Sequence, residues 1–316
     1  MTTGGSAATV ERTFREEQGA VLATLIRHLG DFQLAEDAVQ EAFDAALASW
    51  PGDGVPDNPG AWITVAARRA ALDRLGREES VVDRSAQLAA LARLEAQEHR
   101  SDEEDGAAAD DRLRLLFTCC HPALALPERV ALTLRTLGGL GTGEIARAFV
   151  TSETATVRRL VRARRTIADA GIPYRVPDGE ELPERLSGVL TVIHLIFNEG
   201  YGAAEDGQGL RLGRLLSGLM PHEAEARGLL ALMLLHGSRR DEARTEEGLG
   251  VLDSALTLRR PGPYQLQAAI AALQIEAPGA ELHRTPPLPD DAGPAPDQSL
   301  YAARAALLRR LAALRA

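Results

Sequence analysis

Apolar residues recur along most of the chain at three- and four-residue spacing, which is typical of one face of an α-helix. Three such stretches fill residues 10–76, in VERTFREEQGAVLATLIRHLG, LAEDAVQEAFDAALASW and PGAWITVAARRAALDRLG. The second stretch places Val39, Phe43, Leu47 and Trp50 on one predicted face. A turn-rich loop, PGDGVPDNPG, separates the second and third helices. No stretch of useful length alternates as a strand would, so the predicted fold class is all-α.

The same pattern divides the rest of the chain into three parts. Residues 77–109 are acidic and poor in large apolar residues, which predicts a linker, with a helix left open at 85–97. Residues 110–170 are helical again, and residues 171–316 form a helical C-terminal extension. The helices expected in the extension span 183–197, 209–219, 221–236, 245–258, 263–275 and 299–314. The segment RTPPLPDDAGPAPDQ, ahead of the last of these, predicts a flexible spacer.

The segment TGEIARAFVTSETATVRRLVRARRTI predicts two helices joined by a tight polar turn at Thr151 and Ser152. Two helices connected in this way form a helix-turn-helix. The first helix covers 143–149 and the second covers 153–168. At about 100° per residue, the second helix places Val157, Leu160 and Ile167 on one face, with Arg164 along it.

The other face of that second helix is rich in arginine. Recognition helices contact base edges mainly with their N-terminal residues, so the expected base or groove contacts are Thr154, Ala155, Arg158 and Arg159. Arg162 and Arg165 suit phosphates, which position a protein without reading sequence. A merely solvated arginine face is the alternative interpretation. DNA contact is favoured because the arginines gather on one helix of this motif in a chain of net charge −10.

Composition narrows the class of protein. The 316 residues are 45% hydrophobic but only 4% aromatic, and their abundant Ala and Leu favour helix. All 35 basic residues are arginine, which either codon bias or phosphate contact would explain. The net charge of −10 restricts any DNA contact to a local surface. No apolar run approaches the roughly 20 residues of a membrane span, and the N-terminus lacks the features of a signal peptide. The expected location is therefore cytoplasmic, without membrane contact.

Few residues suggest bond chemistry. Cys119 and Cys120 are adjacent and fit no zinc motif, so they are interpreted as buried structural residues with no metal site. Asn198, Glu199 and Tyr201 invite an acid–base interpretation, but an interdomain contact is the stronger one. The chain offers no evident nucleophile, phosphate loop or metal set. We therefore expect no catalytic residue, no cofactor and no enzymatic activity.

Several of these segments together resemble RNA polymerase sigma factors of the extracytoplasmic-function class. EIARAF…TVRRLVRARRTI resembles the end of sigma region 4, LAEDAVQEAFDAAL resembles region 2.2, and NPGAWITVAARRAALDRLGRE resembles regions 2.3 and 2.4. FTCCHPAL, IPYRVP, LIFNEGY and GPYQLQAAIAA resemble a subfamily with a tetratricopeptide-like extension, which is shorter here. The resemblance implies promoter-specific transcription initiation. Its implied partners are core RNA polymerase and promoter DNA, and an anti-sigma or signalling partner stays open.

The resemblance also assigns roles to parts of the chain. It implies region 2 at 10–76, the linker at 77–109, region 4 at 110–170, and a regulatory extension at 171–316. Region 4 would bind the polymerase β flap through its apolar outer face. Arg69 stands where the family often has Asn, and Gly76 stands where a second basic residue is common, so the preferred −10 sequence is left open. The implied contacts are Asp37, Gln40, Glu41 and Phe43 for the β′ clamp helices, Trp62, Arg68, Arg69, Asp73 and Arg74 for the −10 element, and Thr154, Ala155, Arg158, Arg159, Arg162 and Arg165 for the −35 element.

Two other functions compete with this one. One is a sigma-derived DNA-binding regulator that no longer engages polymerase, and the other is a sigma-like core with a ligand-binding C-terminal domain. DAVQEAF followed by the Trp/Arg helix favours a working sigma factor, because a plain regulator does not need them. The linker is either a nucleic-acid-like segment along the polymerase cleft or a solvated tether.

Overall fold

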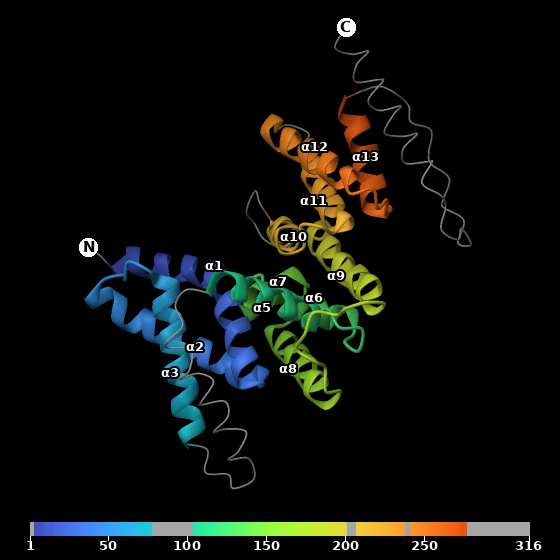
Figure 1. Cartoon of the computed structure of the whole chain (residues 1–316). Helices are drawn as coiled ribbons and strands as arrows, with labels where there is room; N and C mark the ends of the chain where they lie inside the picture. The colour runs from blue at the N-terminus through green and yellow to red at the C-terminus, as the bar shows by residue number, and fades with distance from the viewer. Residues whose placement is uncertain (1–2, 78–103, 201–206, 238–240, 277–316) are drawn as a thin grey trace. The chain divides into compact units, whose positions relative to one another are not determined.

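The computed structural model describes residues 3–77, 104–200, 207–237 and 241–276 (Figure 1). Within these ranges the chain forms twelve α-helices and no strand, so the all-α prediction is confirmed. The chain divides into two compact units, Met1–Gly202 and Ala203–Ala316.

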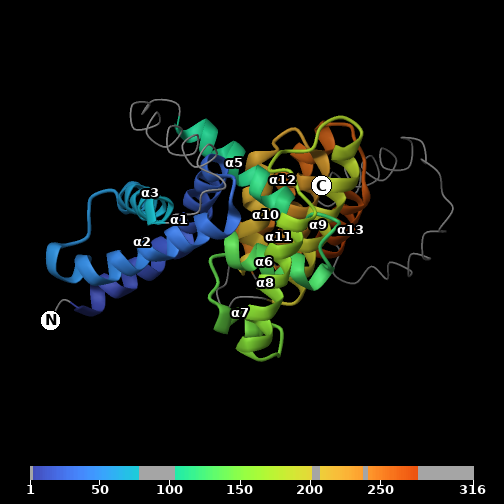
Figure 2. The same ribbon diagram turned by 90° about the horizontal axis from the view of Figure 1, so that it is seen from below.

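The first unit begins with three packed helices, α1 (Thr3–Leu29), α2 (Phe32–Asp53) and α3 (Pro59–Arg77). Helices α1 and α2 lie side by side in both views, and α3 packs on α2 (Figure 2). Leu22 of α1 and Ile63 of α3 are fully buried. All three helices were expected from the apolar spacing.

Capping interactions define both ends of α2. The Asp31 side chain accepts a hydrogen bond from the Leu34 backbone N–H at 3.0 Å, and Gly54 follows the helix with φ of 89°. Along the helix Val39, Phe43 and Trp50 are buried as predicted. Leu47 is 49% exposed, so its predicted place on the same face is wrong.

The described residues of the first unit form five further helices. They are α5 (Glu104–Cys119), α6 (Leu126–Thr136), α7 (Thr142–Ala148), α8 (Glu153–Asp169) and α9 (Glu181–Asn198). Helix α5 begins inside the segment expected to be a linker. Helix α9 packs on α5 and α6, so the first part of the expected extension lies in the first unit. The rest of the linker, with its open helix at 85–97, lies outside the described residues.

Helices α7 and α8 lie where the sequence predicted two helices, and residues 149–152 join them in a short turn. The Ser152 hydroxyl accepts a hydrogen bond from the Ala155 backbone N–H at 3.2 Å and caps α8. Thr156 and Leu160 lie on the buried face of α8, with Ala163 and Ile167. Val157 is 43% exposed, so its predicted place on the same face as the buried Leu160 and Ile167 is wrong.

Backbone segments approach closely where α1 meets the end of α6. A Cβ at Gly19 would lie 3.2 Å from the Thr136 carbonyl oxygen, and one at Gly139 would lie 3.0 Å from the Arg15 Cα. Gly139 also has φ of 66°, which disfavours a larger residue. The Tyr174 hydroxyl lies 2.9 Å from the carbonyl oxygens of both Ala23 and Asp111. These contacts join α1 to the helices that follow it in the first unit.

The second unit contains α10 (Gln208–Leu219), α11 (Ala224–Gly237), α12 (Glu242–Thr257) and α13 (Pro263–Glu276). Helix α11 packs against the other three. The Glu225 carboxylate accepts hydrogen bonds from the backbone N–H groups of Tyr264 and Gln265 at the start of α13. Helices α9 to α13 match the predicted ones within a few residues. The predicted spacer and final helix at 299–314 lie outside the described residues.

Val150 has φ of 50° and is 93% exposed in the turn between α7 and α8. A left-handed conformation costs an L-residue about 1–2 kcal/mol, most of which glycine avoids. We expect Val150→Gly to raise the free energy of unfolding by about 1 kcal/mol, measured by urea denaturation. The matched control is Val161→Gly inside α8, which should lower it by about 1 kcal/mol. Equal losses in the two variants would contradict the expectation.

Candidate functional site

A row of polar side chains covers the exposed face of α2. Gln33 donates a hydrogen bond to Asp37 at 2.9 Å, and Gln40 donates one to Asp44 at 3.2 Å. Both pairs are one helical turn apart. Asp37, Gln40 and Glu41 are three of the predicted polymerase contacts, and the structure brings them together on this face.

Phe43 differs from the other predicted polymerase contacts. It is 2% exposed, and its ring packs edge to face on Phe14 with a centroid distance of 4.8 Å. In this conformation Phe43 supports the polar face of α2 from beneath and does not lie on it.

Arg74 joins α3 to the polar face of α2. Its guanidinium donates to Glu41 at 2.5 Å and to Asp37 at 3.0 Å. The hydrogen bonds that Arg74 donates to Glu41 raise the pKa of Arg74, and the nearby Asp37 adds to the effect. Arg74, predicted to contact the −10 element, therefore neutralises part of the predicted polymerase surface. Two predicted sites share this residue.

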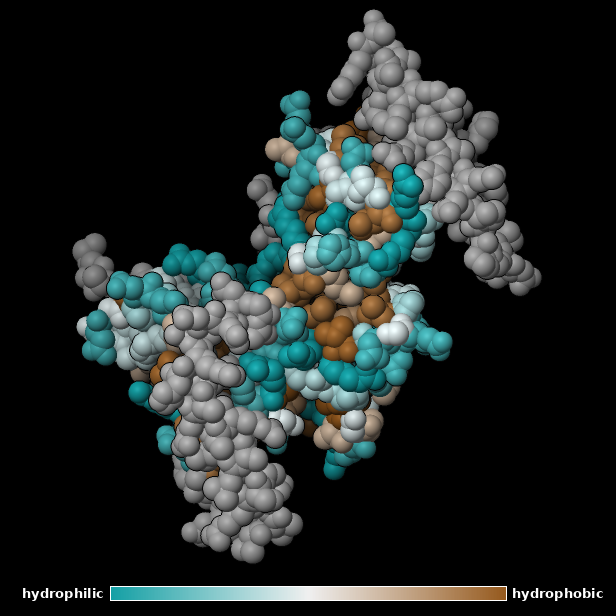
Figure 3. Space-filling view, in the orientation of Figure 1, coloured by the Kyte–Doolittle hydropathy of each residue, from teal (hydrophilic) through white to brown (hydrophobic). Residues whose placement is uncertain are grey.

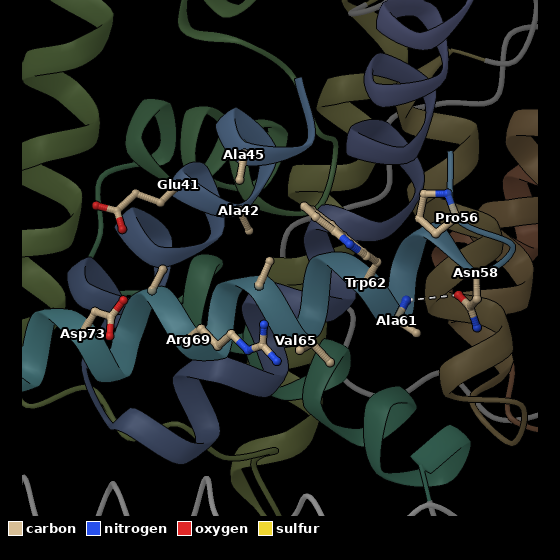
Figure 4. A pocket seen from close by; sticks show the side chains of 12 residues that line it. Glu41, Ala42, Ala45, Pro56, Asn58, Ala61, Trp62, Val65, Arg69 and Asp73 are labelled. Carbon is tan, nitrogen blue, oxygen red and sulfur yellow. Dashed lines mark hydrogen bonds between the residues drawn. The ribbon is translucent and has the colours of Figure 1, made fainter. Parts of the chain in front are cut away.

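A groove of about 720 Å³ runs between α2 and α3 (Figure 4). Trp62, Arg69 and Asp73 line it from α3, and Glu41 lines it from α2. The Trp62 ring meets that of Trp50 edge to face at 5.5 Å, which fixes one wall. Three of the predicted −10 contacts therefore share one groove. The other two predicted −10 contacts do not line the groove. Arg68 is half-buried outside it, and Arg74 forms an ion pair with Glu41.

The predicted −35 contacts are distributed around α8. Thr154, Arg158, Arg162 and Arg165 are exposed, whereas Ala155 is half-buried. The Arg159 guanidinium lies 4.7 Å from the centroid of the Phe149 ring, within the range of a cation–π contact. Four of the six predicted residues therefore lie on the exposed side.

A buried carboxylate that the sequence analysis did not identify links α2 to α6 and α8. The Glu36 side chain is 8% exposed and accepts from Arg164 at 2.6 Å and from Arg135 at 3.4 Å. Arg135 also donates to Gln40 at 3.4 Å and lies 5.7 Å from the centroid of the Phe14 ring. A glutamate beside apolar neighbours in LAEDAV was the only signal, and it does not reveal partners 99 and 128 residues away.

Of the remaining candidate residues, the structure describes Cys119 and Cys120 at the end of α5 and Asn198 and Glu199 at the end of α9. Cys119 and Cys120 are buried, and burial raises the pKa of both thiols, that of Cys120 to about 11. Asn198 ends α9 and Glu199 follows it, while Tyr201 lies outside the described residues. The part of the chain that the structure describes has no group of three or more His, Cys, Asp or Glu suited to a metal ion.

Hydrophilic side chains predominate on the part of the N-terminal helices that Figure 3 leaves uncovered, with single apolar residues between them. Among the described helices, none combines the length and apolar character needed to cross a membrane.

We expect Glu36→Gln to lower the free energy of unfolding of the first unit by roughly 3 kcal/mol. The reason is that Arg135 and Arg164, only 14% and 17% exposed, would lose their shared carboxylate. Urea denaturation followed by circular dichroism would measure the loss. The matched control is Glu16→Gln at an exposed position of α1, where a change within 0.5 kcal/mol is expected. Equal stability of the two variants would show that the network contributes nothing.

Two parts of the chain match known protein families. Residues 13–81 match Sigma-70 region 2, and residues 185–256 match a family of unknown function. An uncharacterized protein of Rhizobium meliloti is 40% identical over 289 residues, covering 81% of this chain and 68% of that protein.

A protein of Mycobacterium tuberculosis described as a probable ECF RNA polymerase sigma factor, SigI, is 32% identical over 168 residues. The alignment covers 53% of this chain and 57% of that protein. No solved structure matches. The region 2 match covers α1 to α3 and their groove, and the chain belongs to the extracytoplasmic-function sigma factors of the sigma-70 family, with a C-terminal region from a family of unknown function.

Proposed function

We propose that this protein directs RNA polymerase to specific promoters. It would bind promoter DNA through two sites, the groove between α2 and α3 and the outer face of α8. The observation that carries the proposal is that a region 2 match, with its polar α2 face and its groove, is followed by two helices joined by a short turn, of which the second, α8, has an outer face rich in arginine. The polar face of α2 would bind the β′ clamp helices through Asp37, Gln40 and Glu41, with Phe43 beneath them. No bond chemistry is required, because the binding energy favours the melted promoter.

The groove between α2 and α3 is the proposed −10 site. Trp62 supplies an aromatic surface on which an unpaired base would stack, a contact worth roughly 1–3 kcal/mol. Arg69 is exposed at the same groove and would contact a phosphate or a base edge. Arg68 and Arg74, which the sequence analysis also assigned here, would position α3.

The outer face of α8 is the proposed −35 site. Arg158 lies in the N-terminal half of the helix, where recognition helices contact base edges. Arg162 and Arg165 lie further along and suit phosphates. Arg159, held over the Phe149 ring, would orient the turn and not read a base.

The compact first unit must open for both sites to work together. A compact unit of roughly 200 residues has a radius of gyration of about 17 Å, so its diameter is about 45 Å. The −35 and −10 elements are named for positions about 25 base pairs apart, which at about 3.4 Å per pair is about 85 Å. The Glu36 contacts with Arg135 and Arg164 would therefore break when the protein engages a promoter.

In vitro transcription with core RNA polymerase and a library of promoter fragments tests the function. We expect protein-dependent transcripts from the wild type and a loss of tenfold or more in Arg158→Ala, since a good base contact contributes about 1–3 kcal/mol. The control is Arg259→Ala, an exposed arginine of the second unit. A folded wild type that binds DNA and gives no transcript would favour a sigma-derived regulator over a working sigma factor.

A reversible crosslink tests the opening step. The double variant Arg15→Cys/Glu144→Cys would be bridged by a bis-maleimide with a reducible spacer, because these two side chains lie on α1 and α7, approach to 3.5 Å, and are 44% and 38% exposed. Cys119 and Cys120 are buried and do not compete for the reagent. We expect the bridged protein to lose promoter-dependent transcription and to regain it on reduction. The two single-cysteine variants, treated identically, are the controls, and undiminished transcription by the bridged protein would rule out the opening step.

A further inference from the structure

Two exposed valines lie on the outer side of α8 among polar and arginine side chains. Val157 is 43% exposed and Val161 is 51% exposed. Rotation by about 100° per residue places Val161 within about 20° of Thr154 and about 60° of Arg158. The buried face, with Thr156 and Leu160, lies on the other side of the helix. Val161 is therefore on the face proposed to enter the DNA groove, and Val157 lies at its edge.

Valine is unsuited to the contacts that the arginines make. Phosphate oxygens are bound by hydrogen-bond donors and positive charge, neither of which valine provides. In the major groove the apolar group exposed at a base edge is the 5-methyl group of thymine. Arg158 and Arg165 lie near Val161 on the same face and provide the charge that would hold an apolar side chain against DNA.

We propose that Val161, with Val157 one turn before it, reads thymine by contact with the 5-methyl groups in the major groove of the −35 element. The inference rests on the proposed function of α8. Single exposed apolar residues are common on protein surfaces and need no explanation. Two at (i, i+4) spacing on the arginine-bearing helix of a helix-turn-helix make one continuous apolar strip.

Helix geometry also constrains where the methyl groups lie. Four residues of α-helix rise about 6 Å, which corresponds to about two base-pair steps of about 3.4 Å. The two valines would therefore contact methyl groups on adjacent base pairs or on pairs two steps apart, on either strand. Selected −35 sequences should contain a short A·T-rich step at this position.

The test uses the holoenzyme formed from the full-length protein and core polymerase. The −35 sequence is first selected from a randomised promoter library. Each thymine in it is then replaced by deoxyuridine, which lacks only the 5-methyl group, and binding is measured for every replacement. At one or two positions we expect about fourfold weaker binding by the wild type, the effect of exposing one buried methyl group. Val161→Ala should bind thymine and deoxyuridine probes equally at the position that Val161 reads.

Two other variants make the result specific. Val150→Ala changes an exposed valine in the turn outside α8, and it should keep the full response to deoxyuridine. Arg158→Ala should weaken binding to every probe and also keep that response. A wild type indifferent to deoxyuridine at all positions, while Arg158→Ala still weakens binding, overturns the thymine contact and leaves the proposed function intact.

Two further outcomes also overturn the inference. If Val161→Ala weakens assembly with core polymerase in the absence of DNA, the valines form a polymerase-docking surface. If the holoenzyme binds no selected sequence and Arg158→Ala has no effect, the proposed function of α8 fails and the thymine contact fails with it.

Discussion

The buried carboxylate of Glu36 is the contact on which the arrangement of the first unit depends. It lies on α2, and its two arginine partners lie on α6 and α8. A carboxylate that is 8% exposed is costly unless it is paired, so these helices must lie where both arginines reach it. Asp111 repeats the principle, because it is fully buried and pairs with Arg27 and Arg114. Burial raises the pKa of Asp111, and the two arginines oppose that rise.

Charged contacts of this kind hold helices in place without making their separation prohibitive. When a buried ion pair opens, both partners regain hydration, and this offsets much of the lost attraction. An apolar interface of similar area would expose its surface to water without such compensation. The contact of Glu36 with Arg135 and Arg164 is therefore of a kind that can form in the free protein and open when the protein engages a promoter, as proposed. Gln40 takes part in both the contact between helices and the proposed polymerase surface. It accepts a hydrogen bond from Arg135, and it lies on the polar face of α2.

The sequence predicted helix positions well and helix faces less well. Each four-residue step advances a helix by about 40° beyond a full turn, so Leu47 lies about 80° from Val39 and emerges from the core. In α8 the sequence analysis considered only apolar residues, so it grouped Val157 with Leu160 and left out Thr156. The buried face is centred nearer Thr156. Glu36 was missed because its partners are distant in sequence, and periodicity carries no information about tertiary pairing. The positions of α7, α8 and the turn between them were predicted because their spacing and turn residues are local in sequence.

Fewer arginines of α8 are available to the proposed DNA-facing side than their number suggests. Arg164 pairs with Glu36 and Arg159 lies over Phe149, so both are engaged within the protein. Arg162 lies 3.7 Å from Glu128, whose negative charge offsets part of the positive charge on this side of α8. In a chain of net charge −10, phosphate attraction alone would therefore hold α8 on DNA weakly. Such a helix suits a protein whose partner polymerase supplies most of the affinity for DNA. The contribution of α8 would then be the choice of sequence. An apolar contact with thymine would add to that choice without adding charge.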